Sequence, residues 1–229
     1  MEEGNHKEWI DSFADYDKLE YERVIDKALN TKEGPIKMGE VARRVSEATG
    51  NSALLVTDVG QNQMFACRYF KNTRPHSVLT SGGLGTMGYG LPAAMGATMA
   101  VPDRMVCVFM GDGGFQMNIQ ELGTIMEQRS PVKMILMNNN YLGNVRQWQE
   151  MFFNYRYSWT PMMNPDYNMI VSAYGIPSRL VVKREELDDA IREMIETPGA
   201  FLLHVAVEEE ENVMPMVPPG ASICDMLLE

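Results

Sequence analysis

The sequence predicts an α/β fold in which one parallel sheet is covered by helices on both faces, in three layers. Short apolar runs alternate along the chain with segments of helical periodicity. These runs are apolar at nearly every position, as strands buried on both faces are. The 229 residues are 45% hydrophobic, which is enough for one sizeable core but leaves little room for a second full domain.

The core is expected to begin at Ile36. Residues 1–35 are polar and charged with scattered aromatic side chains, so they are predicted to form a lead-in segment with helical turns. An amphipathic helix follows, and Gly50 is expected to end it. Its apolar residues recur at helical spacing: Met38, Val41, Ala42, Val45 and Ala48.

Strands and helices then alternate to the end of the core. Strands are predicted at residues 53–57, near 78, at 105–110, at 132–137, near 180 and at 201–207. Helices are predicted at about 87–100, through Ile119, Leu122 and Met126, from about Asn144, at 167–174, and through Leu187, Ala190, Ile191, Met194 and Ile195. The domain is therefore expected to span residues 36–207, with residues 208–229 as a C-terminal arm that packs on another surface.

Bulk properties exclude several classes of function. A formal net charge of −11 and a pI of about 4.8 oppose attraction to nucleic acid or to an anionic membrane. No apolar run is long enough to span a membrane, and the acidic start has no signal peptide. The three cysteines lack the spacing of a disulfide framework or a zinc site. A cytoplasmic protein is therefore expected.

A glycine-rich turn follows the predicted strand at residues 105–110. Its sequence is Gly111-Asp112-Gly113-Gly114, and a helix with Phe115, Ile119 and Leu122 on its apolar face is expected to begin there. Glycines let a backbone approach phosphate closely, and a helix N-terminus offers free N–H groups. The turn therefore predicts a cradle for a diphosphate, with Asp112 available for a divalent cation.

The next predicted strand ends in Asn138-Asn139. In a parallel sheet, a strand, a helix and a strand return the chain to the same edge, so Asp112 and Asn139 are expected side by side. Mg²⁺ prefers six hard oxygen ligands. One carboxylate, one amide oxygen, one backbone carbonyl, two diphosphate oxygens and a water would complete that set.

Gly-Asp-Gly followed by Asn-Asn resembles the cofactor motif of thiamine-diphosphate enzymes. Within that superfamily, four segments are similar to acetohydroxyacid (acetolactate) synthases, so the similarity spans nearly the whole chain. These segments are residues 58–64 (DVGQNQM), 81–88 (SGGLGTMG), 139–143 (NNYLG) and 145–149 (VRQWQ).

The resemblance implies the thiamine-diphosphate-binding fold and a transferase of branched-chain amino acid biosynthesis. Such an enzyme decarboxylates pyruvate and joins the two-carbon unit to pyruvate or to 2-oxobutanoate. In the family, the glutamate that pairs with the pyrimidine lies in a separate domain, normally on a partner subunit, and FAD has its main site in a middle domain. The isolated chain is therefore expected to be nearly inactive. The implied partners are this pyrimidine-binding domain, further copies in a homo-oligomer and a regulatory subunit.

The resemblance also assigns roles to residues. Met87 is implied to wedge the cofactor into a bent shape, which makes it a catalytic residue as well as a cofactor contact. The implied metal ligands are Asp112, Asn139 and the backbone carbonyl of Tyr141. The implied cofactor-binding residues are Val59, Gln61, Asn62, Gly85, Met87, Gly111, Gly113, Gly114, Gly143, Asn144 and Val145.

The chain departs from the family pattern at three of these positions. His is usual where this chain has Asn62 and frequent where it has Tyr141, and Met is common where it has Asn144. A carbonyl ligand survives the change at Tyr141, because every residue has that group. The other two changes affect a side-chain role for Asn62 and the packing of the cofactor near Asn144.

Trp148 matches the family tryptophan that shapes the pocket for the second substrate and favours 2-oxobutanoate. A plain helix-face aromatic in the core is the alternative. Phe152, Phe153 and residues 213–220 resemble elements that close over the site.

Other interpretations remain open. Gly83-Leu84-Gly85-Thr86-Met87-Gly88 also matches the GxGxxG pattern of nicotinamide-nucleotide sites. Another thiamine-diphosphate decarboxylase, oxidase or carboligase, or a diphosphate-binding module without activity, fits the same motifs. His6, His76 and His204 lack ligand spacing, so core or surface roles are expected for them, with His204 in a strand. The acidic run at residues 208–211 is expected to be a solvated face.

Overall fold

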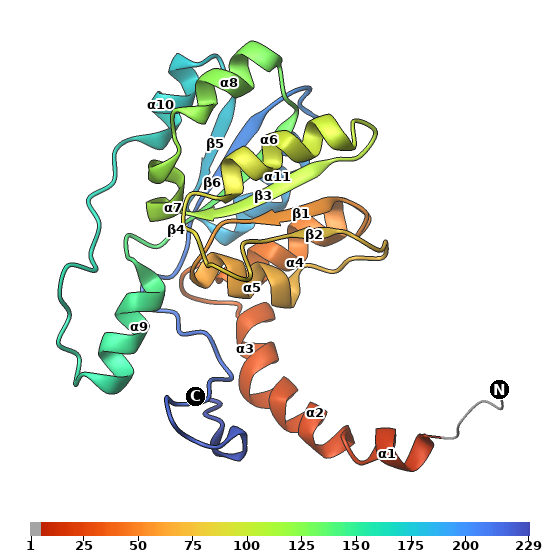
Figure 1. The fold of residues 1–229 in the computed structure, drawn as a ribbon, viewed down its shortest axis with the longest axis vertical. Coiled ribbons are helices and arrows are strands. Elements are labelled where there is room, and N and C mark those ends of the chain that lie inside the picture. Colours follow the sequence, from red (N-terminus) through yellow and green to blue (C-terminus); the bar gives the residue numbers. More distant parts are fainter. Residues whose placement is uncertain (1–5) are drawn as a thin grey trace. The chain divides into compact units, whose positions relative to one another are not determined.

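The computed structural model describes residues 6–229, and these form two compact units (Figure 1). One unit holds the described residues up to Glu33 together with Val213–Glu229. The other is Gly34–Asn212 and contains the sheet.

The sheet has six parallel strands in the order β2-β1-β3-β4-β6-β5. This confirms the predicted parallel α/β fold. The register pairs Gly111 with Met137, so β3 and β4 end at neighbouring positions. The strands are β1 Leu54–Thr57, β2 Val78–Leu79, β3 Val106–Gly111, β4 Val132–Asn138, β5 Ser178–Val181 and β6 Phe201–Ala206.

Helices cover both faces of the sheet, which gives three layers (Figure 1). One face carries α4 Met38–Ala48, α5 Gln61–Tyr69 and α11 Leu187–Glu196. The other carries α6 Gly90–Ala100, α7 Asp112–Met117, α8 Glu121–Gln128 and α10 Tyr167–Ala173, and α9 spans Gly143–Phe152. β3 and β4 are buried along almost their whole length, and successive side chains point to opposite layers. Their continuous apolar sequence follows from this double coverage.

Two predicted helices differ in the structure, one at a glycine turn and one at an asparagine. α6 begins at Gly90 rather than near Met87, since Gly88 has a φ of 87° and breaks the helical conformation before it. The single helix expected through Phe115 and Leu122 is two helices, α7 and α8. They are separated at Asn118, whose side-chain amide donates 2.6 Å to the Gly88 carbonyl and holds the chain in the turn.

The predicted elements do not include α5. Its polar start, Gln61-Asn62-Gln63, conceals a helix whose buried side is formed by Phe65, Ala66 and Tyr69. α4 ends as expected, with Gly50 in a left-handed conformation just beyond it.

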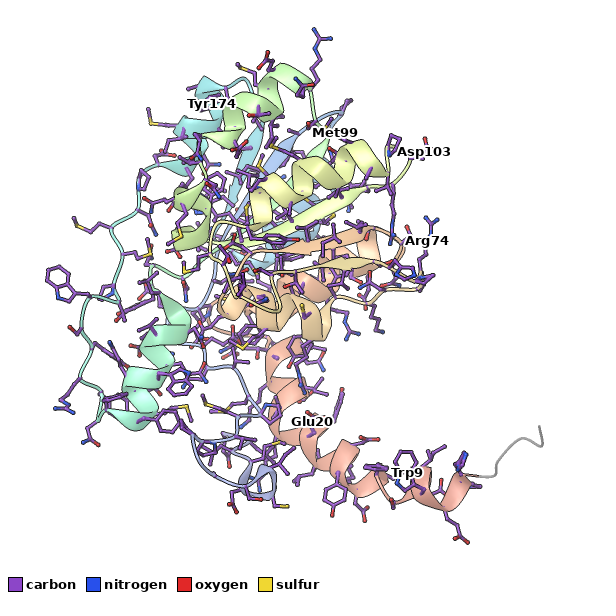
Figure 2. The ribbon with its side chains drawn as sticks, viewed as in Figure 1. Trp9, Glu20, Arg74, Met99, Asp103 and Tyr174 are labelled. Carbon is purple, nitrogen blue, oxygen red and sulfur yellow. The ribbon has the colours of Figure 1, made fainter. Side chains whose placement is uncertain are left out.

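The described N-terminal part of the smaller unit is mainly helical, whereas residues 213–229 are mostly irregular; residues 1–5 of the expected lead-in segment lie outside the described residues. It holds α1 Lys7–Asp11, α2 Ala14–Glu20, a π-helical turn at Tyr21–Ile25, α3 Asp26–Leu29 and a 3₁₀ turn at Ile223–Asp225. Most of its side chains are exposed, and Trp9 projects from α1 (Figure 2). Within the unit, Arg23 and Lys27 form ion pairs with Glu229 at 2.6 and 3.2 Å.

Candidate active site at the carboxyl edge of the sheet

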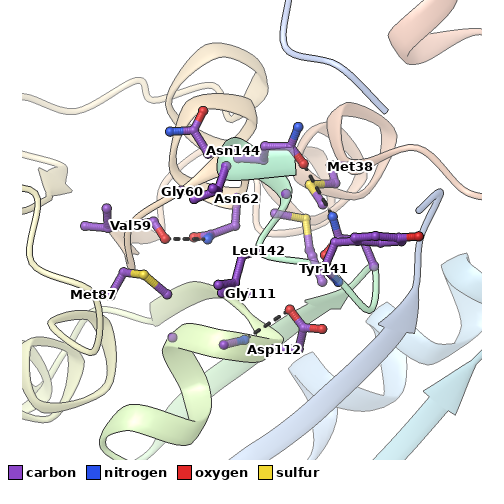
Figure 3. A pocket seen from close by; sticks show the side chains of 17 residues that line it. Met38, Val59, Gly60, Asn62, Met87, Gly111, Asp112, Tyr141, Leu142 and Asn144 are labelled. Atoms are coloured by element: carbon purple, nitrogen blue, oxygen red, sulfur yellow. Dashed lines mark hydrogen bonds between the residues drawn. The ribbon is translucent and has the colours of Figure 1, made fainter. Parts of the chain in front are cut away.

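A pocket lies beyond the carboxyl ends of β1, β3 and β4 (Figure 3). In a parallel α/β sheet this is the edge where ligands bind. The loops after these three strands supply most of its wall. The pocket is lined by Met38, Val59, Gly60, Gln61, Asn62, Met87, Gly111, Asp112, Gly113, Gly114, Met137, Asn139, Tyr141, Leu142, Gly143, Asn144 and Val145.

The structure brings together almost all of the residues that the sequence singles out for cofactor and metal. Asp112 and Asn139 are both buried and both line this one pocket. In Figure 3, Met87 and Val59 lie on one side of the pocket and Asp112 and Tyr141 on the other. Gly85 and Trp148 are the predicted site residues that do not line it.

Asp112 is held in a fixed orientation. Its Oδ1 accepts a hydrogen bond from the backbone N–H of Gly113 at 3.0 Å, and its Oδ2 accepts from Nδ2 of Asn164 at 2.7 Å. Burial raises the pKa of Asp112, while these hydrogen bonds lower it. A divalent cation beside the carboxylate would stabilise its charged form.

Asn139 is fixed through its amide nitrogen. Nδ2 donates to Oε1 of Gln61 at 3.3 Å, so Oδ1 is the atom available to a cation. The backbone N–H of Tyr141 approaches that oxygen at 3.4 Å. One carboxylate and one amide oxygen of this hard type suit Mg²⁺. Among the described residues no cluster of three His, Cys, Asp or Glu side chains could hold a metal without further ligands.

Glycines allow the loops of the site to approach one another. A Cβ on Gly143 would lie 2.1 Å from Oε1 of Gln61, and one on Gly113 would lie 2.9 Å from Cδ2 of Leu142. A Cβ on Gly114 would lie 2.1 Å from Oδ1 of Asp58. A contact below about 3 Å forces the neighbouring atoms to shift, so a larger residue at these positions would displace Gln61, Leu142 or Asp58.

Asp58 fixes the turn that carries Met87. Its buried carboxylate accepts from the backbone N–H groups of Val59 at 2.8 Å, Gly88 at 3.1 Å and Gly90 at 2.8 Å. The first N–H group of α6, that of Gly90, is thereby bonded to a carboxylate of the protein itself. A negative charge at this helix start opposes the binding of a nucleotide phosphate there, which argues against the nicotinamide interpretation.

Asn62 carries an orphaned polar atom at the pocket. Nδ2 donates to the Val59 carbonyl at 3.2 Å, whereas the buried Oδ1 has no hydrogen-bond partner. A buried acceptor without a donor is unfavourable by about 1–3 kcal/mol, so a donor from a ligand or from ordered water is expected there.

Trp148 lies on α9 and is 39% exposed, so it is not buried in the core. Its ring contacts Phe152 edge to face, with centroids 5.2 Å apart. Phe153, at the end of α9, is also exposed, and residues 213–220 belong to the smaller unit. His204 lies in β6 and is buried, as expected.

Several residues that line the pocket are not among the predicted site residues. Gly60 and Leu142 stand beside predicted site residues, and Gly60 has a φ of 123°, so the Val-Gly-Gln sequence could have indicated it. Met38 and Met137 carry no comparable signal, because ordinary core methionines look the same in a sequence.

The expectation of a solvated acidic face at residues 208–211 is wrong for Glu211, which is 8% exposed. Its Oε2 accepts from the backbone N–H of Met38 at 3.0 Å, and its backbone carbonyl accepts from Nε2 of Gln61 at 2.7 Å. Burial raises the pKa of Glu211 to about 7, although the Met38 N–H and Lys37 act against it. The chain packs there because Glu211 bridges α4 and the pocket wall.

We expect Glu211→Gln to change how stability depends on pH. The folded-state pKa lies above the ordinary value, so ionisation destabilises the fold as pH rises from about 4.5 through about 7. The difference in unfolding free energy between the uncharged variant and wild type should therefore shift in favour of the variant by on the order of 2–3 kcal/mol between pH 5 and pH 8. Urea unfolding at both pH values measures this. The exposed neighbour Glu210→Gln is the control, and an identical pH dependence in wild type and Glu211→Gln would contradict the assignment.

Comparisons with known proteins identify relatives of the chain. Residues 58–205 match the family model described as "Thiamine pyrophosphate enzyme, C-terminal TPP binding domain". The large subunit of acetolactate synthase isozyme 2 from Escherichia coli is 46% identical over 81% of this chain and 34% of its own length. The mitochondrial acetolactate synthase catalytic subunit of Saccharomyces cerevisiae is 38% identical over 96% of this chain and 33% of its own length. The chain thus spans about a third of these relatives.

A solved structure has the same fold. Benzoylformate decarboxylase from Polynucleobacter necessarius superimposes with a TM-score of 0.72 over 80% of this chain and 36% of that chain, at 24% identity. In the part of the chain that the structure describes, no helix is both long and apolar enough to cross a membrane.

Proposed function

Since the chain belongs to the thiamine pyrophosphate enzymes and contains their C-terminal TPP-binding domain, we propose that its pocket binds this cofactor. One Mg²⁺ ion would hold the cofactor's diphosphate there. The observation that carries the proposal is the convergence of Asp112 and Asn139 on one pocket. The proposed ligands are Asp112, Oδ1 of Asn139 and the Tyr141 carbonyl.

The residues of the pocket fit a diphosphate and a cation. Asp112 supplies the single negative charge, and the diphosphate would bring the remaining anionic oxygens. Gly111, Gly113 and Gly114 have no side chains, so the backbone is accessible on either side of Asp112, and α7 begins there. The orphaned Oδ1 of Asn62 suits a hydrogen bond from a water bound to the cation.

When bound, thiamine diphosphate supplies a carbon nucleophile and stores the electron pair released when a 2-oxo acid loses carbon dioxide. The proposed work of this chain is to bind and to orient. Gln61 and Asn139 hold each other beside the cation, Val59 and Met87 form an apolar wall, and Asp58 keeps Met87 in place through its turn.

We propose acetolactate synthesis as the activity to which this domain contributes, within branched-chain amino acid biosynthesis in the cytoplasm. The support is the similarity to acetolactate synthases over most of the chain. The substrates would be pyruvate and either pyruvate or 2-oxobutanoate. A different thiamine-diphosphate decarboxylase, oxidase or carboligase shares the cofactor site and is the alternative; a diphosphate-binding module without activity is a second.

A set of exposed apolar side chains, which we call the apolar rim, supports the proposal that a protein partner binds at the pocket. Its members stand in segments that contribute to or adjoin the pocket wall, and Leu84, Trp159 and Met163 are 93%, 94% and 99% exposed. We propose that a pyrimidine-binding domain covers this rim in a homo-oligomer and thereby completes the site. FAD and a regulatory subunit would belong to the same assembly. The apolar rim consists of Leu84, Val145, Trp148, Phe153, Trp159 and Met163.

A calorimetric titration tests the cofactor proposal. Thiamine diphosphate should bind the wild-type chain with Mg²⁺ and bind much more weakly with EDTA, since the cation joins the diphosphate to Asp112 and Asn139. Turnover of pyruvate should be negligible until a pyrimidine-binding domain is added. Equal binding with and without Mg²⁺ would refute the metal site, and full acetolactate formation by the chain alone would refute the need for a partner.

We expect Trp148→Leu to reduce the preference for 2-oxobutanoate by about tenfold in the reconstituted enzyme, because it removes an aromatic wall from the proposed acceptor pocket. The ratio of acetohydroxybutyrate to acetolactate measures this preference. Trp159→Leu is the matched control: loss of rim contact would lower both products together and leave their ratio unchanged. An unchanged ratio in Trp148→Leu would exclude this tryptophan from acceptor selection.

A further inference from the structure

Asn164 lies outside every cofactor motif of the sequence and yet contacts the proposed metal carboxylate. Its Nδ2 donates to Oδ2 of Asp112 at 2.7 Å and lies 3.1 Å from Oδ1 of both Asn138 and Asn140. It belongs to the loop between α9 and α10, far in sequence from Asp112.

The orientation of the Asn164 amide is determined from both ends. Oδ1 accepts from Nε2 of Gln116 at 3.1 Å and from the hydroxyl of Tyr167 at 2.9 Å. If the amide were flipped, its NH₂ group would face these donors, and an oxygen would face the Asp112 carboxylate. The observed orientation places the NH₂ group toward the carboxylate and the amide oxygen toward the two donors.

The same logic extends to His204. Oδ1 of Asn138 accepts from the backbone N–H of Asn140 at 3.1 Å and also lies 3.1 Å from Nδ2 of Asn164. Nδ2 of Asn138 therefore faces Nε2 of His204 at 3.1 Å and requires an acceptor there. Nδ1 of His204 lies 2.8 Å from Oδ1 of Asn168, whose Nδ2 donates to Ser178 at 3.0 Å, so Nδ1 carries the proton. Burial lowers the pKa of His204, which agrees with a neutral ring.

We propose that Asn164 is a positioning residue that fixes the Asp112 carboxylate before the cation binds, and that neutral His204, as the Nδ1–H tautomer, fixes Asn164 through Asn138. The inference rests on the proposed magnesium site. Hydrogen-bond partners that orient metal ligands typically change metal affinity by 10- to 100-fold when they are removed. His204 therefore has a role at the metal, although it has neither ligand spacing nor a place in the pocket.

The test is the affinity of the chain for Mn²⁺ in the presence of inorganic pyrophosphate, measured by the electron paramagnetic resonance signal of free Mn²⁺. Asn164→Leu, which keeps the volume and removes the amide, should weaken binding by about 10- to 100-fold. His204→Leu should weaken it less, by about three- to tenfold, because it acts one residue further away.

Two controls separate positioning from general loss of structure. Ile191→Ala removes buried volume from α11, a helix that carries no residue of the network, so it should lower the melting temperature and leave Mn²⁺ affinity unchanged. Met163→Ala alters the exposed neighbour of Asn164 and should change neither. All affinities are measured well below each variant's melting temperature.

A spectroscopic readout addresses the tautomer. The chain has three histidines, so a ¹⁵N spectrum of histidine-labelled protein can be assigned with His204→Leu. His204 should show a protonated Nδ1 and an unprotonated Nε2 at neutral pH. A protonated Nε2, or Mn²⁺ affinity unchanged in Asn164→Leu, would overturn this inference alone. A wild-type chain that binds no Mn²⁺ with pyrophosphate would overturn the proposed function and this inference with it.

Discussion

We expect Asp112→Asn to lose magnesium-dependent binding of thiamine diphosphate, with an affinity at least about 100-fold lower than that of wild type, or roughly 3 kcal/mol. The variant keeps the size of the side chain and removes its charge. Asp112 is the one carboxylate in the proposed ligand set, and an amide oxygen interacts with Mg²⁺ far less strongly than a carboxylate does. Calorimetric titration with saturating Mg²⁺ measures the change.

Asp103→Asn is the matched control for this substitution. Asp103 is exposed in the loop between α6 and β3 (Figure 2), so its variant should bind the cofactor as wild type does. A near wild-type affinity in Asp112→Asn would show that the carboxylate is not a ligand. Circular dichroism of each variant verifies that the fold is intact.

We expect Gly114→Ala to be the most destabilising single methyl addition at the site. The new Cβ would lie 2.1 Å from Oδ1 of Asp58, a buried carboxylate that holds the backbone N–H groups of Val59, Gly88 and Gly90. Asp58 cannot retreat without leaving these buried groups unpaired. The loss should exceed about 4 kcal/mol, which corresponds to a fall in melting temperature of roughly 10 °C or more, or to insoluble protein.

Gly96→Ala provides the contrast. Gly96 is exposed in α6, nothing lies within 4 Å of the added Cβ, and alanine favours a helix by about 0.5–1 kcal/mol. This variant should therefore melt slightly higher than wild type. If Gly114→Ala melted like wild type, Asp58 would have room to move. Close packing of these loops would then not explain the glycine at position 114.

The arrangement of the sheet could be predicted because its strands carry their signal locally. Residues 105–110 are apolar throughout, and residues 132–137 are apolar except at Lys133; the polar site residues Asp112 and Asn139 follow within two positions of these runs. Parallel topology then brings these strand ends together without any further information. The convergence of the main site residues follows from this local pattern.

The missing parts depend on contacts between distant residues. A glutamate in an acidic run gives no sign that a distant backbone N–H will donate a hydrogen bond to it, so the burial of Glu211 could not be predicted. The same holds for Asn118, whose bond to the Gly88 carbonyl separates α7 from α8. Asn164 likewise contacts Asp112, and His204 contacts Asn138 beside Asn164, only because the fold brings these distant residues together.

The central claim is that Asp112 and Asn139 bind one cation that anchors a diphosphate. A crystal structure of the chain grown with thiamine diphosphate and Mn²⁺, with data collected at the manganese absorption edge, tests it most directly. The account predicts one anomalous peak within coordination distance of the Asp112 carboxylate, Oδ1 of Asn139 and the diphosphate. A diphosphate bound elsewhere, or a manganese peak that contacts neither side chain, would contradict it.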